Sequence, residues 1–310
     1  MELHRLGPVR ALPLPLIGRF GGAPAARPTL ADVPAERIAE SLAFINWTVL
    51  TALGVGSFAA VVAGRFRTDA TRGYLAFTAF SSAAFALLAG ATDSSLPALL
   101  PALALHPDPG WDGLRRLGLL ALPIIAAIYG VVLLRGRRAA PLAVAGLVAA
   151  ALVLVTGALS WGGGGLGSVL LLVELTGLSA VLGGVWAAMI LGHWYLVTPR
   201  LPEAPLVRFA RWLGVALAVQ VGLFVAWIGF GAGPSGTPAF TALVGPWALF
   251  VWLRLLVGIV FPLVVSWAAV QTARSRSMES ATGLLYINVG TIAAGTILAA
   301  GLYFGAGLLV

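Results

Sequence analysis

Long stretches without a charged side chain recur from about residue 40 onward, and they limit the fold more than any other feature of this chain. A helix of about 20 apolar residues crosses the hydrocarbon core of a bilayer, which is about 30 Å thick. Eight stretches are long enough, namely 40–64, 74–91, 116–134, 140–160, 167–197, 206–231, 245–271 and 281–308. The sequence therefore predicts an all-α, polytopic integral membrane helix bundle with about eight transmembrane helices.

The composition supports a membrane protein and argues against a water-soluble one. Only 10% of the 310 residues are charged and 60% are hydrophobic, whereas soluble domains carry about 25% charged residues. The first part of the chain, residues 1–38, differs because it is rich in proline and arginine. Its apolar run is interrupted by Pro13 and Pro15, so it lacks the continuous core of a signal peptide. We expect a tail over 1–38, lying on the membrane or on a partner subunit, followed by a transmembrane bundle over 39–310.

Arginines are concentrated in alternate connections between the expected spans, which predicts the orientation. Four connections carry Arg65, Arg67, Arg72, Arg135, Arg137, Arg138, Arg200, Arg208, Arg211, Arg274 and Arg276. The other connections hold only Arg115 and Arg116. Because cytoplasmic loops are enriched in basic residues, we expect both termini on the non-cytoplasmic side of a multi-pass protein in a bacterial-type inner (cytoplasmic) membrane. Arginines of the tail, such as Arg5 and Arg10, oppose this assignment.

Several kinds of chemistry are excluded by residues that the sequence lacks. The chain has no cysteine, so it offers no disulfide, covalent haem or cysteine-ligated iron–sulfur cluster. All 19 basic residues are arginine, which excludes a Schiff base on lysine. The chain has a net charge of +8, and the arginines that produce it lie at the edges of the expected spans. We therefore expect no nucleic-acid partner. Lipid, and other membrane or periplasmic redox subunits, are the partners that this composition favours.

Histidines and outer acids do not form a metal motif. His4, His106 and His193 are expected at places that cannot meet inside the membrane, so a haem held by two histidines of this chain is not expected. The acids after the second span do not have the spacing of a ligand motif. We interpret Asp93, Asp108, Asp112 and His106 as parts of a solvated loop, and we expect no metal site.

Two ionisable residues are expected within the bilayer at similar depth. Glu174 lies about eight residues from the outer end of the fifth span, and Arg254 lies about as far into the seventh. Because unpaired charges in a bilayer are costly, we expect an ion pair between Glu174 and Arg254. The pair is either a structural clamp or part of a site for a polar head group, quinone or anion.

A second candidate site lies where the fifth span ends. His193, Trp194 and Tyr195 are followed closely by Arg200, an unusually polar and aromatic sequence for the end of a span. These side chains fit a quinone head group or an anionic lipid, and an interfacial anchor is the alternative. The same span carries Ala180, Gly184, Ala188 and Gly192 at intervals of four. This row of small residues predicts close helix packing and a central place in the bundle.

Two functions remain as hypotheses. The first is an integral membrane subunit of a respiratory or photosynthetic electron-transfer complex, which anchors partner subunits and binds quinone or lipid. We expect such a chain to be non-catalytic or quinone-binding within a larger oxidoreductase, and we identify no catalytic residue. The alternative is a small-molecule or ion transporter or channel, which predicts broken helices and polar groups near the bilayer midplane, where Gln220 is the clearest.

Overall fold

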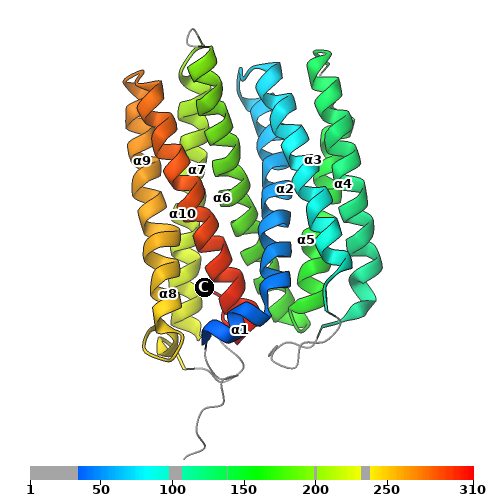
Figure 1. Ribbon diagram of the computed structural model, residues 1–310, viewed down its shortest axis with the longest axis vertical. Helices are drawn as coiled ribbons and strands as arrows, with labels where there is room; N and C mark the ends of the chain where they lie inside the picture. The colour runs from blue at the N-terminus through cyan, green and yellow to red at the C-terminus, as the bar shows by residue number, and fades with distance from the viewer. Residues whose placement is uncertain (1–33, 98–106, 138, 199–200, 232–237) are drawn as a thin grey trace, which may run out of the picture.

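The computed structural model describes residues 34–97, 107–137, 139–198, 201–231 and 238–310 (Figure 1). Within these ranges the chain is helical, and eight helical stretches are long and apolar enough to cross a membrane. Each coincides with one of the eight expected spans, so the prediction of an all-α membrane helix bundle is confirmed.

Ten α-helices make up the described chain. They are α1 (Pro34–Glu40), α2 (Leu42–Arg67), α3 (Arg72–Ser94), α4 (Asp112–Leu134), α5 (Ala140–Trp161), α6 (Gly165–Val197), α7 (Ala204–Phe230), α8 (Ala248–Leu255), α9 (Phe261–Arg274) and α10 (Met278–Ala306). A π-helical turn, Leu256–Val260, joins α8 to α9, so these two helices form a single crossing. The short helix α1 begins within the expected tail, since residues 34–38 of that tail are helical.

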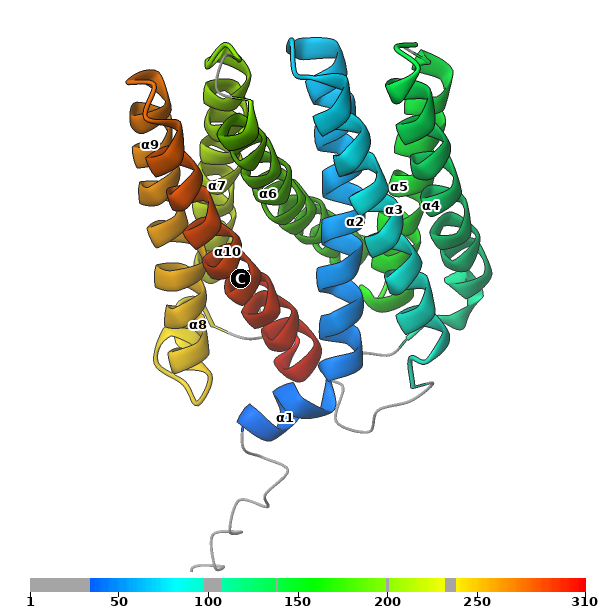
Figure 2. The same cartoon turned by 45° about the horizontal axis from the view of Figure 1, so that its top comes forward.

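The crossings run up and down the bundle in alternating directions (Figure 1). Short connections make helices that follow one another in sequence antiparallel neighbours. One side of the bundle is built from α2 to α5 and the other from α6 to α10 (Figures 1 and 2). Helices α2 and α6 meet between the two sides, and α6 also packs against α5, α7 and α10. The expected central position of this helix is therefore confirmed.

The closest contact between α2 and α6 involves glycines, but not the ones that the sequence analysis selected. The main chains of Gly56 and Gly183 lie so close that a Cβ atom on either would overlap the other helix. In contrast, Ala180 is exposed and Gly184 borders open space. The expected row of small residues is therefore wrong at Ala180 and Gly184. The face of α6 that packs against α2 contains Ser179 and Gly183, each one residue before the expected position, because α2 approaches from that side.

The two ends of the bundle differ in charge. The connections after α2, α4, α6 and α9 share one end, which we call the arginine-rich end. Helix α1 and the C-terminus lie toward the other, which we call the α1 end (Figure 1). After α10 the chain turns back at Gly307, which adopts the left-handed conformation with φ 70°. The following residues are buried, and they pack against α7, α8 and α10.

Candidate functional site

Glu174 and Arg254 lie together inside the bundle. Glu174 Oε1 and Arg254 Nη2 are 3.7 Å apart, and only 6% and 1% of the two residues are exposed. Glu174 lies about 15 Å along α6 from its start at the α1 end, within a helix long and apolar enough to cross a membrane. The structure thus brings together the two charges that the sequence analysis paired.

Three further groups complete the surroundings of this pair. Arg254 Nη2 donates a hydrogen bond to Gln220 Oε1 at 3.2 Å, and Arg254 Nε donates to the main-chain carbonyl of Val310 at 3.2 Å. Trp227 Nε1 donates to Glu174 Oε2 at 3.4 Å. We call Glu174, Gln220, Trp227, Arg254 and Val310 the Arg254 cluster. Its members come from α6, α7, α8 and the segment after α10, so it links four parts of one half of the bundle.

The Arg254 cluster leaves polar atoms unpaired. Gln220 Nε2 and Glu174 Oε1 are buried, and neither makes a hydrogen bond to any described residue. An unmade hydrogen bond in an apolar medium costs several kcal/mol, because neither water nor lipid tails replace it. The cluster therefore holds one amide donor, Gln220 Nε2, and one carboxylate oxygen, Glu174 Oε1, that make no hydrogen bond.

Backbone geometry beside Arg254 is also unusual. The π-helical turn begins two residues after Arg254, and Gly258 of this turn faces Gly295 of α10. A Cβ atom on Gly258 would lie 2.5 Å from Gly295 Cα, so only glycine allows this approach. Single π-helical turns inside longer helices are frequent at functional sites. Here the turn lets α8 present Arg254 to the cluster while α9 continues toward the arginine-rich end.

The second candidate site does not converge on one pocket. His193 is exposed, and its Nδ1 lies 3.2 Å from the Tyr286 hydroxyl. Trp194 packs over Gly73 of α3, whereas the buried Tyr195 donates to the Pro202 carbonyl at 2.5 Å. Arg200 lies outside the described residues. The three described side chains therefore do not converge: His193 faces α10, Trp194 packs on α3, and Tyr195 reaches the connection before α7.

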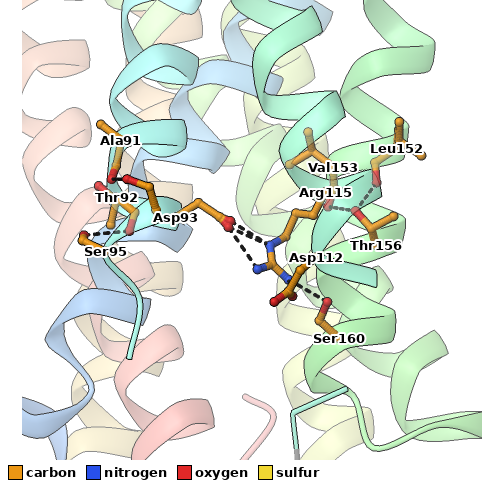
Figure 3. A network of polar contacts seen from close by, with 11 residues as sticks. Ala91, Thr92, Asp93, Ser95, Asp112, Arg115, Leu152, Val153, Thr156 and Ser160 are labelled. Carbon is orange, nitrogen blue, oxygen red and sulfur yellow. Dashed lines mark hydrogen bonds and ion pairs between the residues drawn. The ribbon is translucent and has the colours of Figure 1, made fainter. Parts of the chain in front are cut away.

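A second buried ion pair was missed by the sequence analysis (Figure 3). Asp93, at the end of α3, is buried and accepts hydrogen bonds from Arg115 Nε at 3.0 Å, so its assignment to a solvated loop is wrong. Arg115 Nη1 also contacts Ser160 Oγ at 2.6 Å and Asp112 at 2.8 Å. The Arg115 guanidinium stacks over the Trp161 ring, 4.6 Å from its centre.

The sequence contained a signal for this second pair. Asp93 lies at the end of one apolar span and Arg115 at the start of the next. Antiparallel packing of these two helices puts both residues at the same end of the bundle. Asp108 behaves differently, since it is a loop residue that accepts a hydrogen bond from Gly110 N at 2.9 Å. His106 lies outside the described residues. No group of acids and histidines in the described ranges is arranged to hold a metal ion.

The fold and these clusters define a class: a polytopic α-helical membrane protein that holds two buried arginine–carboxylate pairs. No protein-family model matches the chain, and no curated protein or solved structure shows significant similarity to it. The chemistry of its own residues therefore has to carry the functional argument.

Proposed function

We propose that this chain is an integral membrane subunit of an electron-transfer complex, and that the Arg254 cluster binds a quinone or a lipid head group. The proposal is based on two buried atoms of the cluster that make no hydrogen bond, Gln220 Nε2 and Glu174 Oε1. Quinones are lipid-soluble molecules whose head groups present carbonyl oxygens, or hydroxyls when reduced. Gln220 Nε2 would donate to such a carbonyl, and Glu174 Oε1 would accept from such a hydroxyl.

Partner subunits would supply the electron carriers in this arrangement. The connections at the arginine-rich end are short, whereas residues 95–111 and 231–247 form longer connections at the α1 end, where a partner subunit would find more than helix ends for docking. Following the bias in arginine, we place the arginine-rich end in the cytoplasm of a bacterial-type inner membrane. The α1 end then faces periplasmic redox subunits.

The first test is purification of the full chain from its native membrane in a mild detergent. An optical spectrum, mass spectrometry of copurifying subunits and extraction of bound quinone are measured on the same sample. Copurifying cytochromes or iron–sulfur proteins together with quinone are the expected result. A colourless preparation without partners or quinone would overturn the proposal.

A pair of matched variants then tests the site. Gln220→Leu removes the free donor, and we expect it to abolish retention of quinone. Asn288→Leu is the control, because Asn288 is also a buried amide but donates to Ser266 and Pro262, away from the Arg254 cluster. Equal quinone content in both variants would show that quinone does not depend on the cluster.

One observation favours transport as a second candidate function. Transporters interrupt their helices beside the binding site, and the π-helical turn interrupts the α8–α9 crossing directly after Arg254. Flux of small anions into liposomes that contain only this chain would test it. If the chain is a transporter, we expect flux that is abolished by Gly258→Ala and unchanged by Gly184→Ala. No flux into liposomes that contain the folded protein would reject transport.

A further inference from the structure

A group of arginines at the arginine-rich end surrounds a hollow that none of the sites above includes. Arg67 of α2 and Arg208 and Arg211 of α7 line a space of about 390 Å³, together with Trp212 and Val215. Arg208 Nη1 donates a hydrogen bond to the main-chain carbonyl of Arg67. This contact joins the start of α7 to the end of α2, and it brings the arginines from two helices to one place.

These arginines have no acidic partner within the described part of the chain. None of the three forms an ion pair there, although like charges that gather at one site repel one another. The nearby acids do not neutralise the group: Glu203 faces Arg276 at 3.6 Å, and Asp69 lines a neighbouring hollow that Arg67 also borders, without an ion pair between them in the described chain. All three arginines are exposed, so they are accessible to an anion from outside the chain.

The position of the hollow along α7 suggests which anion it takes. Helix α7 has 27 residues and is about 40 Å long, so it exceeds a hydrocarbon core of about 30 Å. Arg208 and Arg211 lie in its first turns and would extend into the head-group layer. Trp212 follows directly, and tryptophan is typical of the boundary between head groups and lipid chains. The arginines would therefore lie at the level of lipid phosphates.

An apolar track continues from the hollow along the same face of α7. Val215, Val219 and Val225 are all more than half exposed, and they lie on this face with the exposed Gly222. A Cβ atom added to Gly222 would touch nothing within 4 Å. This surface suits an extended lipid chain, whereas a soluble anion would gain nothing from it.

From this arrangement we infer that Arg67, Arg208, Arg211 and Trp212 form a binding site for an anionic phospholipid. The phosphate lies among the guanidinium groups, which donate charge-assisted hydrogen bonds to its oxygens. The acyl chain follows Val215 and Val219 along α7. This site is separate from the Arg254 cluster, so it stands or fails independently of the proposed function.

The test compares lipid binding by two charge-matched variants in detergent solution. R67Q/R211Q removes two of the arginines but keeps the carbonyl of residue 67, to which Arg208 donates. R135Q/R137Q is the control, because it removes two exposed arginines at the same end that do not line the hollow. Native mass spectrometry with added phosphatidylglycerol reports the bound fraction, and thermal unfolding without lipid shows that each variant is folded.

We expect phosphatidylglycerol to bind the unmodified chain and the control equally. The affinity of R67Q/R211Q should fall about 25-fold, because each arginine near an anionic head group contributes about fivefold. Equal losses in both variants would show a diffuse effect of charge and overturn the site. Equal binding of phosphatidylcholine would overturn it too. Competition by inorganic phosphate at the same concentrations would assign the hollow to a soluble anion and reject the lipid.

Discussion

At the scale of single residues, the two buried arginines differ in how completely they are paired. Arg115 has acceptors for Nε, Nη1 and Nη2, and none of the polar atoms around it is left without a hydrogen bond. In the Arg254 cluster, Gln220 Nε2 and Glu174 Oε1 make no hydrogen bond, although Glu174 Oε1 faces Arg254 in the ion pair. A hollow of about 400 Å³ borders the Arg115 network, so the two sites are distinguished here by their hydrogen bonding and not by open space. This difference in hydrogen bonding is the reason why the proposed ligand site is at the Arg254 cluster and not at Arg115.

Substitution of only one partner of the Asp93–Arg115 pair should destabilise the protein strongly. Asp93→Asn leaves the Arg115 charge buried without its counter-ion, and we expect a loss of about 3–5 kcal/mol in the free energy of unfolding. The double variant Asp93→Leu with Arg115→Met removes both charges and should lose less. Thermal and denaturant unfolding in detergent measure both. Asp108→Asn, at a loop residue, is the control and should change stability by less than about 0.5 kcal/mol.

The Glu174–Arg254 pair makes a related prediction about coupling. Glu174→Gln and Arg254→Leu should each destabilise the bundle, because each leaves the partner charge buried. The double variant should be less destabilised than the sum of the two by about 0.5–3 kcal/mol. Unfolding free energies of the four proteins in a double-mutant cycle give this coupling. Strictly additive losses would mean that the two charges do not interact.

At the scale of helices, close approach of backbones holds the two sides of the bundle together. Lipid tails are as apolar as leucine side chains, so helices in a membrane gain from tight packing and hydrogen bonds rather than from leaving the solvent. The contact between Gly56 of α2 and Gly183 of α6 is of this kind. Ser82 Oγ adds a hydrogen bond from α3 to the Gly54 carbonyl at 2.6 Å. Helix α2 is therefore fixed on two faces by residues without large side chains.

Adjacent glycines of α6 give a sharp test of this packing. Gly183→Ala introduces a methyl group into the main chain of α2, so we expect it to lower the unfolding temperature strongly or prevent folding. The methyl group that Gly184→Ala adds points into open space, so this variant should be neutral or stabilise the helix by up to about 1 kcal/mol. Thermal unfolding of the two variants in the same detergent compares them. Equal behaviour would show that α2 and α6 do not cross at Gly183.

At the scale of the whole molecule, charge is distributed unevenly between the two ends. The described helix ends and connections at the arginine-rich end carry Arg65, Arg67, Arg72, Arg135, Arg137, Arg208, Arg211, Arg274 and Arg276. At the α1 end, Arg115 is occupied by its ion pairs with Asp93 and Asp112. A protein with this distribution should be inserted in one direction, with the arginine-rich end in the cytoplasm.

The lack of cysteine in the sequence makes this orientation directly measurable. We expect a cysteine at the exposed Ser275, on the arginine-rich end, to react with a membrane-impermeant maleimide only after the cells are opened. A cysteine at the exposed Gly113, on the α1 end, should react in intact cells whose outer envelope has been permeabilised. The reverse pattern would place both described ends of the chain in the cytoplasm.

The sequence by itself determined the number and limits of the crossings, because hydropathy along the chain reflects the thickness of the bilayer and needs no knowledge of neighbours. It also paired Glu174 with Arg254, since depth follows from distance along each helix. The tertiary structure alone decided which face of α6 meets α2 and that Gln220 and Val310 join Arg254, and it showed that Asp93 is buried against Arg115. These are matters of helix rotation and of contacts between distant segments. In a chain that is apolar on nearly every face, hydropathy does not distinguish the packed side of a helix from the lipid side.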